Sequence, residues 1–391
     1  MLSFTKSAQS YIFFFVTIFA VGIVISFSFN LLFSQEKSGL NGAKEVLEQA
    51  FAECTNVQRG LFFSCFSEYV RPYIRAQGID ELVTVIDQEI QEDLNSQGGS
   101  LDRCHDVMHV IGQIGASEVG SQQTLQECST VCGAGCFHGV VEDYVAKSGD
   151  LSQAMTSLCK ETDDPQFNRS LWACFHGLGH GVGTLIGEAI ESFEMCDLAP
   201  NELGRENCSY GVFMELFETS SFGHETLPIP ADLRSFCDSL WGIHQEVCYG
   251  YSGLLALQRD NSIDSAALAC SSVPQDHELS CISHLGNMAY YYYQDDLDEL
   301  RLFCTQFGEE AELECMLGML QESVNSDPQA RIGFALCDSL QDQGKQQTAQ
   351  SCYKELGKKL YHFFGNEKRL ELCSQVTDVA YQACSSGTYG Q

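Results

Sequence analysis

The twenty cysteines of this 391-residue chain are mostly arranged in pairs that recur at a regular interval. From residue 159 onward there are seven such pairs, and their first members lie 33 to 41 residues apart. A repeat of this length is typical of arrays of α-helical hairpins, in which each unit packs on the next. The spacing therefore predicts an all-α fold of the α-solenoid class.

One unit illustrates how a cysteine pair would be used. Residues 232–240 and 245–258 carry apolar side chains at spacings of three and four, which predicts two helices separated near Trp241 and Gly242. Cys237 and Cys248 each lie about five residues from that turn, so they would face each other across an antiparallel helix pair. A disulfide that closes such a loop is worth about 3 kcal/mol in the chain-entropy model.

We predict about nine to ten disulfide-stapled helical hairpins behind one N-terminal transmembrane helix. Zinc bound by thiolates is the alternative use of the cysteines, but the sequence contains no Cys-x-x-Cys motif. Four cysteines near the start, residues 104, 128, 132 and 136, allow three connectivities, among which the sequence does not choose. The expected disulfides are Cys54–Cys65, Cys104–Cys132, Cys128–Cys136, Cys159–Cys174, Cys196–Cys208, Cys237–Cys248, Cys270–Cys281, Cys304–Cys315, Cys337–Cys352 and Cys373–Cys384.

Glycine follows three residues after several of the second cysteines, at Gly139, Gly177, Gly211 and Gly318. Because glycine lowers helix propensity, close packing of the helix backbone is the expected reason for its presence.

The stapled hairpins resemble those of secreted, cysteine-rich relatives of tetratricopeptide repeat proteins. The resemblance covers residues 46–391 and concerns architecture, since the spacing within each cysteine pair is longer and the Trp/Gly/Tyr pattern of the tetratricopeptide repeat is not evident. It implies an α-solenoid and assigns no functional residue.

Residues 11–33 form an uncharged run of 23 residues that is rich in Phe, Ile and Val. As a helix this run would be about 34 Å long, enough to cross a bilayer. A membrane signal-anchor is therefore predicted, with a cleaved signal peptide as the alternative. All twenty cysteines follow it, so the bulk of the chain is expected in an oxidising, extracytoplasmic place: the periplasm, the cell surface or a lumen.

The predicted divisions of the chain follow from the cysteine and histidine patterns. They are residues 1–10 as a cytoplasmic tail, 11–33 as the anchor, 34–45 as a linker, 46–120 as irregular helical repeats, 121–222 as histidine-bearing repeats and 223–391 as C-terminal repeats.

The chain is strongly acidic: it has 53 Asp and Glu residues and 21 Lys and Arg residues, which gives a net charge of -32. This balance argues against nucleic acid as a partner, because the sequence has no basic stretch to neutralise phosphates. The expected partners are the membrane, through the N-terminal helix, and an exported protein or peptide, for which basic character would be favoured by the field.

Five of the ten histidines lie between residues 105 and 180. His105 and His109 are four residues apart, and so are His176 and His180. His138 has a carboxylate, that of residue 142, at the same distance. Residues at i and i+4 lie on one helix face, and neighbouring helices pack about 8–10 Å apart, so imidazoles from adjacent units can meet at one ion.

The later units serve as an internal comparison. The same two places hold Tyr210 and Met214 in the next unit, so the second helix of a hairpin forms without histidine. We therefore predict a site for one or two transition-metal ions, which would be zinc (Zn), iron (Fe) or copper (Cu). The predicted ligands are His105, His109, His138, Glu142, His176 and His180, and the residues expected to orient or bridge them are Asp106, Asp143 and Glu188.

Alternatives remain open on the sequence alone. A buried hydrogen-bonded network and a pH-sensitive binding surface both use histidine clusters. The segment from His105 to His109 also has the layout of the zincin motif, with Asp106 in place of the general-base glutamate. In addition, His105 directly follows its cysteine, whereas His138 and His176 follow theirs with one residue between. That difference would turn the helix face by about 100° unless the cysteine is the element that is offset.

The function predicted from these features is that of a membrane-anchored, extracytoplasmic metal-binding protein, either purely metal-binding or a non-haem metalloenzyme of oxidation or hydrolysis. In outline it is similar to deoxyhypusine hydroxylase, a di-iron enzyme on a helical-repeat scaffold, although the adjacent His-Glu motif of that enzyme is not matched. The alternative is a non-catalytic solenoid that binds another exported protein or peptide.

Overall fold

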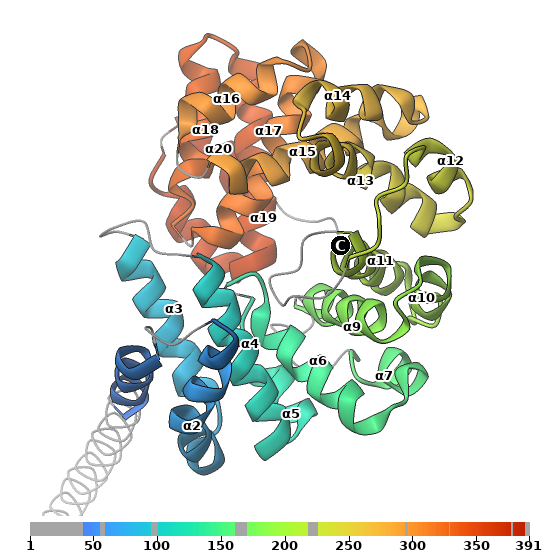
Figure 1. Ribbon diagram of the computed structural model, residues 1–391. Helices are drawn as coiled ribbons and strands as arrows, with labels where there is room; N and C mark the ends of the chain where they lie inside the picture. Colours follow the sequence, from blue (N-terminus) through green and yellow to red (C-terminus); the bar gives the residue numbers. More distant parts are fainter. Residues whose placement is uncertain are drawn as a thin grey trace, which may run out of the picture.

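Figure 1 shows the computed structural model of the chain, which describes residues 42–54, 59–94, 101–130, 132–160, 170–217, 226–293, 296–327, 329–376 and 378–387. The predicted transmembrane segment, residues 11–33, lies outside these ranges, as does the predicted cytoplasmic tail, residues 1–10. Within the described part, no helix combines the length and the apolar composition that crossing a membrane requires.

All regular structure in the described ranges is α-helical, which confirms the predicted all-α class. The helices form ten consecutive hairpins, called units below, and each unit has a helix A followed by a helix B. The A helices are residues 42–54, α3 (Asp80–Leu94), α5 (Ser121–Glu127), α7 (Leu151–Ser157), α10 (Ala189–Cys196), α12 (Leu233–Asp238), α14 (Ile263–Ser272), α16 (Leu297–Thr305) and α18 (Arg331–Asp342). The B helices are α2 (Arg59–Gln77), α4 (Leu101–Glu118), α6 (Gly135–Ser148), α9 (Leu171–Ile186), α11 (Glu202–Phe217), α13 (Gly242–Asp260), α15 (Gln275–Tyr293), α17 (Glu309–Ser326), α19 (Gln346–Cys373) and α20 (Asp378–Ser386).

Helix α19 serves two units. Gly365 has a φ of 80° and breaks the helical geometry, so the residues before it form helix B of the ninth unit and the residues after it form helix A of the tenth.

Several A helices begin at a side chain that caps them. Asp150, Asp232, Ser262 and Asp296 each accept a hydrogen bond from the backbone N–H three residues later. Such a cap satisfies one of the free N–H groups of the first turn and is worth about 1 kcal/mol. These residues therefore fix where the short A helices start.

All twenty cysteines are disulfide-bonded. Nine disulfides join helix A of a unit, or the residues that end it, to helix B of the same unit, with Cα–Cα distances of 5.4 to 5.8 Å. The tenth, Cys104–Cys132, instead joins α4 to the turn before α6 and so links two units. The sulfur bridges therefore hold nine of the ten hairpins closed, and the second hairpin, α3 with α4, is instead bonded to the third.

Glycines hold successive B helices together at four places. A Cβ atom on Gly139 of α6 would lie under 3.0 Å from the carbonyl oxygen of His109 in α4. In return, a Cβ on Gly112 of α4 would lie equally close to the carbonyl oxygen of Cys136 in α6. Only glycine permits this approach, so the two helices pack backbone to backbone. The same reciprocal contact joins α9 to α11, α15 to α17 and α19 to the residue after α20, through Gly179 and Gly211, Gly286 and Gly318, and Gly357 and Gly387.

The junction between α6 and α9 is built differently. Gly177 and Gly181 of α9 face α6 without touching a carbonyl oxygen. A Cβ on Gly177 would lie 3.2 Å from the ring of His138 and 3.3 Å from its Cα atom, and a Cβ on Gly181 would lie 3.5 Å from a methyl group of Val141. Helices α6 and α9 therefore approach each other less closely than the pairs joined by reciprocal glycine contacts, and the ring of His138 lies at their junction.

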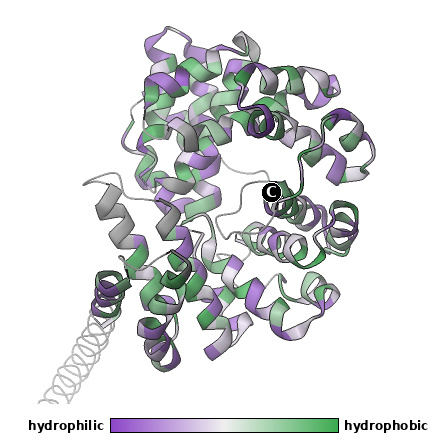
Figure 2. Cartoon of the chain, viewed as in Figure 1, coloured by the Kyte–Doolittle hydropathy of each residue, from purple (hydrophilic) through white to green (hydrophobic). Residues whose placement is uncertain are grey.

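The units curve round so that the ninth returns to the fourth (Figure 1). The ring of Trp172 in α9 lies 5.8 Å from that of His362 and 5.7 Å from that of Phe363, both in α19. In Figure 2 hydrophobic and hydrophilic residues alternate around the helices. The apolar side chains form two buried clusters, one in the first two units that extends to Cys132 and Cys136, and one that runs from the third unit to the tenth.

Replacement of Gly318 by alanine should lower the free energy of unfolding by about 1–3 kcal/mol. The new Cβ would overlap the carbonyl oxygen of Ser283 and push α15 and α17 apart. Gly181→Ala is the matched control: it also lies inside a B helix, but its Cβ would meet only Val141 and Val145 at ordinary distances. That substitution should be neutral or stabilise by up to about 1 kcal/mol through helix propensity. Urea unfolding checks both values, and equal effects would contradict the role of the glycine contact.

Candidate metal centre

Three consecutive B helices bring the five clustered histidines together. His105 and His109 lie on α4, His138 on α6, and His176 and His180 on α9. The ring of His138 is in the middle, with ring centroids 5.1 Å from His105, 6.5 Å from His109, 5.4 Å from His176 and 4.7 Å from His180. The cluster therefore spans both the glycine-locked junction of α4 with α6 and the looser junction of α6 with α9.

The glycine contacts explain the register of the two His-x-x-x-His pairs. His109 and His176 each lie three residues before the glycine of their helix, Gly112 and Gly179, and each turns its carbonyl toward the glycine of the next B helix. His109 and His176 are thus equivalent positions, and the pair on α4 lies one turn earlier than the pair on α9. A shift of one turn keeps the pairs on the same helix face, so the offset noted in the sequence belongs to Cys104 and does not rotate the histidines.

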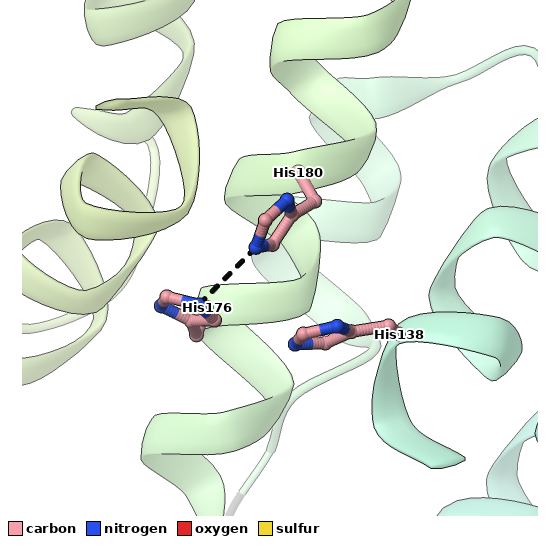
Figure 3. A group of neighbouring side chains, drawn as sticks. All are labelled: His138, His176 and His180. Carbon is pink, nitrogen blue, oxygen red and sulfur yellow. Dashed lines mark hydrogen bonds between the residues drawn. The ribbon is translucent and has the colours of Figure 1, made fainter. Parts of the chain in front are cut away.

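Three of the imidazoles converge closely, as Figure 3 shows. His138, His176 and His180 each offer one ring nitrogen, and these three nitrogens lie within 4.8 Å of one another. Among the described residues, these three histidines are the group that could hold a metal ion. The Nε2 atoms of His176 and His180 are 3.2 Å apart. The Nε2 atom of His138 is buried and has no hydrogen-bond partner.

Carboxylates hold two of the histidines. The Nδ1 atom of His180 lies 3.0 Å from Glu215 of α11, whose other oxygen accepts a hydrogen bond from the hydroxyl of Thr184. Because a carboxylate only accepts, the hydrogen of neutral His180 is on Nδ1 and its Nε2 lone pair points into the cluster. On the other side, Nε2 of His109 lies 2.9 Å from Glu142.

The sequence did not single out Glu215. Tyr210 and Met214 occupy the positions in α11 that correspond to the histidines, and Glu215 is the residue after Met214. Gly183 of α9 allows the approach, since a Cβ there would lie under 3.0 Å from the side chain of Glu215. A signal was therefore present in the sequence, namely a glutamate one turn beyond the glycine-locked contact of α11, but its partner could only be recognised once the helix pairs were known.

Three of the imidazoles have lowered pKa values. The pKa of His105 is lowered to about 4, first by burial and then by the neighbouring His109. The pKa values of His138 and His176 are also well below 6.5, first because of burial and then because of the other imidazoles. Neutral imidazole is the form that binds a metal ion.

The other predicted residues occupy different places. Asp106 is buried on α4, and the Nδ1–H group of its neighbour His105 donates to the carbonyl oxygen of Cys132, 3.0 Å away. Asp143 is paired with Lys147 at 2.8 Å on its own helix. Glu188 is exposed at the N-cap of α10, beyond the end of α9. Glu142, predicted as a ligand, contacts His109, and Glu215, which was not predicted, contacts His180.

A second hydrogen-bonded chain lies behind α11. His244 of α13 connects Ser209, at 2.6 Å from its Nδ1, with Asp197, at 3.0 Å from its Nε2. Trp241 donates to the same aspartate. Ser209 and His244 are completely buried, so a substrate does not reach this serine in the described structure. These hydrogen bonds instead tie α11, which carries Glu215, to the end of α10 and to α13 of the sixth unit.

No protein-family model matches the sequence, and no curated protein or solved structure matches it either. The site is therefore interpreted from its own geometry.

In the metal-free protein, the free energy of unfolding should fall as the pH is lowered from about 6.5 toward about 4. The buried imidazoles of His105, His138 and His176 have folded pKa values below their ordinary value of 6.5, so the unfolded chain binds more protons in this window. Each contributes a slope of up to about 1.4 kcal/mol per pH unit. Urea unfolding after metal removal, at several pH values, measures the slope.

His105→Gln should reduce that slope, whereas His277→Gln, at a histidine outside the cluster, should leave it unchanged. A slope that is the same in both variants and in the unmodified protein would contradict the assignment to the buried imidazoles.

Proposed function

We propose that this protein binds one transition-metal ion, of which zinc fits best, through His138, His176 and His180. The observation that supports this most directly is the buried Nε2 atom of His138, which has no hydrogen-bond partner yet points toward two other imidazoles. A buried nitrogen without a partner costs about 1–3 kcal/mol, and a bound ion would remove that cost.

The distances fit this proposal. Zinc–nitrogen bonds of about 2.0–2.1 Å in a tetrahedral site separate two ligand nitrogens by about 3.4 Å. The Nε2 atoms of His176 and His180 are already 3.2 Å apart. The nitrogen of His138 needs only a small side-chain adjustment to join them, since all three lie within 4.8 Å.

The surroundings also favour a metal ion. Glu215 fixes the tautomer of His180, as carboxylates do for metal-binding histidines. His176 of α9 is held by a hydrogen bond to the backbone of Asn207, which lies on α11 like Glu215. Iron and copper also bind imidazole, but three neutral imidazoles in a site of tetrahedral spacing match the common preference of zinc.

We further propose that the protein works outside the cytoplasm and that residues 11–33 anchor it to a membrane. Ten disulfides in one chain support an oxidising compartment.

Elemental analysis of the purified full-length protein should find one zinc ion per chain. His138→Ala and His176→Ala should each weaken zinc binding by more than about 100-fold. Loss of a residue that only orients a ligand costs about 10–100-fold, and loss of a ligand should cost more. His277→Ala, at a histidine that packs on Tyr249 outside the cluster, is the matched control and should retain the metal. No metal in a zinc-replete, folded preparation would contradict the proposal and favour a solenoid that binds an exported protein.

Glu215→Gln should weaken zinc binding by about 10–100-fold, because an amide can present its N–H₂ group and no longer fixes the hydrogen of His180 on Nδ1. Competition with a chromogenic chelator measures the change. Glu188→Gln removes an exposed carboxylate at the N-cap of α10 and should have no effect. Equal affinities of the two variants would remove Glu215 from the centre.

A further inference from the structure

The number of protein ligands at the centre is the starting point, and the inference rests on the metal site proposed above. Zinc in proteins is almost always four-coordinate, and structural sites supply four protein ligands, whereas catalytic sites supply three and leave one position for water. The group of converging donors among the described residues has three members, His138, His176 and His180.

The nearest carboxylates have other hydrogen-bond partners. Glu215 accepts from Thr184 and contacts His180 through its other oxygen. Glu142 contacts His109. Each is thus placed to orient an imidazole, and moving either one to the metal would break that contact.

The cluster is largely buried but reaches solvent at both of its ends. At one end His109 is 6% exposed and its partner Glu142 is 35% exposed. At the opposite end Glu215 is 9% exposed and His180, one of the three proposed ligands, is 16% exposed. A small molecule can therefore approach the imidazoles at either end, and Glu142 carries the more exposed charge.

We propose that the centre is open: water is its fourth ligand, small anions can replace that water, and the metal-bound water acts as the nucleophile in hydrolysis. Three neutral imidazoles leave the full positive charge of the ion to polarise the water, and the buried surroundings strengthen that effect.

The reaction on an ester substrate is balanced as follows. The metal-bound water gives one proton to solvent and becomes hydroxide, which forms a bond to the carbonyl carbon. The bond from that carbon to the alkoxide or phenoxide breaks, the leaving group takes up a proton, and the acid is released. A second water then occupies the fourth position.

Cobalt(II) substituted for zinc reports the fourth position through its visible absorption bands. Titration of the cobalt protein with sodium azide should change the bands and saturate at one azide per metal ion. The metal content of the same sample is measured in parallel, so that failure to bind cobalt, which would refute the metal site itself, is separated from failure to bind azide. A spectrum that azide does not alter at full cobalt occupancy would overturn the open centre.

His105 provides a check for a closed site. If its imidazole were the fourth ligand, azide would have no effect on the unmodified protein but would alter the spectrum of His105→Ala, and that outcome would overturn the proposal. The open centre predicts an azide response in both proteins.

The exposed charge of Glu142 gives a matched pair of variants. Glu142→Gln removes a negative charge beside the approach, so azide should bind about 2–5-fold more tightly at low ionic strength. Glu188→Gln removes a charge outside the cluster and should leave azide binding unchanged. Equal azide affinities in the two variants would show that the approach does not pass Glu142.

Hydrolysis is tested with 4-nitrophenyl acetate. The zinc protein should release 4-nitrophenolate at least about ten times faster than the same sample after zinc removal, with inhibition by azide. His176→Ala should be no faster than the metal-free protein. A rate that does not depend on zinc, in a protein shown to contain it, would overturn the hydrolytic role.

Discussion

The backbone contact between glycine and carbonyl decides where everything else in this protein can lie. At Gly139 and Gly211 two B helices touch without side chains between them, so α4 with α6, and α9 with α11, behave as rigid pairs. His138, His176 and His180 lie where these two pairs meet. Because α6 and α9 approach each other less closely than the locked pairs, the rings of His138 and His176 can lie at their junction, and the locked pairs on either side hold those rings at a constant distance.

Disulfides and glycines restrain different directions of the solenoid. Nine sulfur bridges hold helix A to helix B within a unit, while the glycine contacts hold helix B to helix B between units. Neither restraint crosses the junction of α6 with α9. Burying several imidazoles at that unrestrained junction is unfavourable unless their nitrogens find partners, and Glu142 and Glu215 supply partners only at the two ends of the cluster.

The cysteine spacing alone predicts the hairpins, because a pair equidistant from a turn has one sensible use in an oxidising compartment. The i, i+4 spacing likewise predicts that His176 and His180 share a helix face. The contacts between helices of different units could not be predicted from the sequence. The alternation of locked and loose junctions depends on which helix each glycine touches, and Glu215 becomes a partner of His180 only because Gly183 allows close approach. Cys104 could not be used to align the histidines of α4 with those of α9. It bonds to a cysteine of the next unit, so its position differs from those of the cysteines that bond within a unit.

A metal ion at this junction would complete the set of restraints. Bound to His138 on one locked pair and to His176 and His180 on the other, it would join α6 to α9 as the disulfides join A to B. Its binding free energy would then also be free energy of association between the third and fourth units. The contact of Trp172 with α19 lies one turn from His176 on α9, so an ion that fixed the position of α9 would also influence how the ninth unit closes the superhelix.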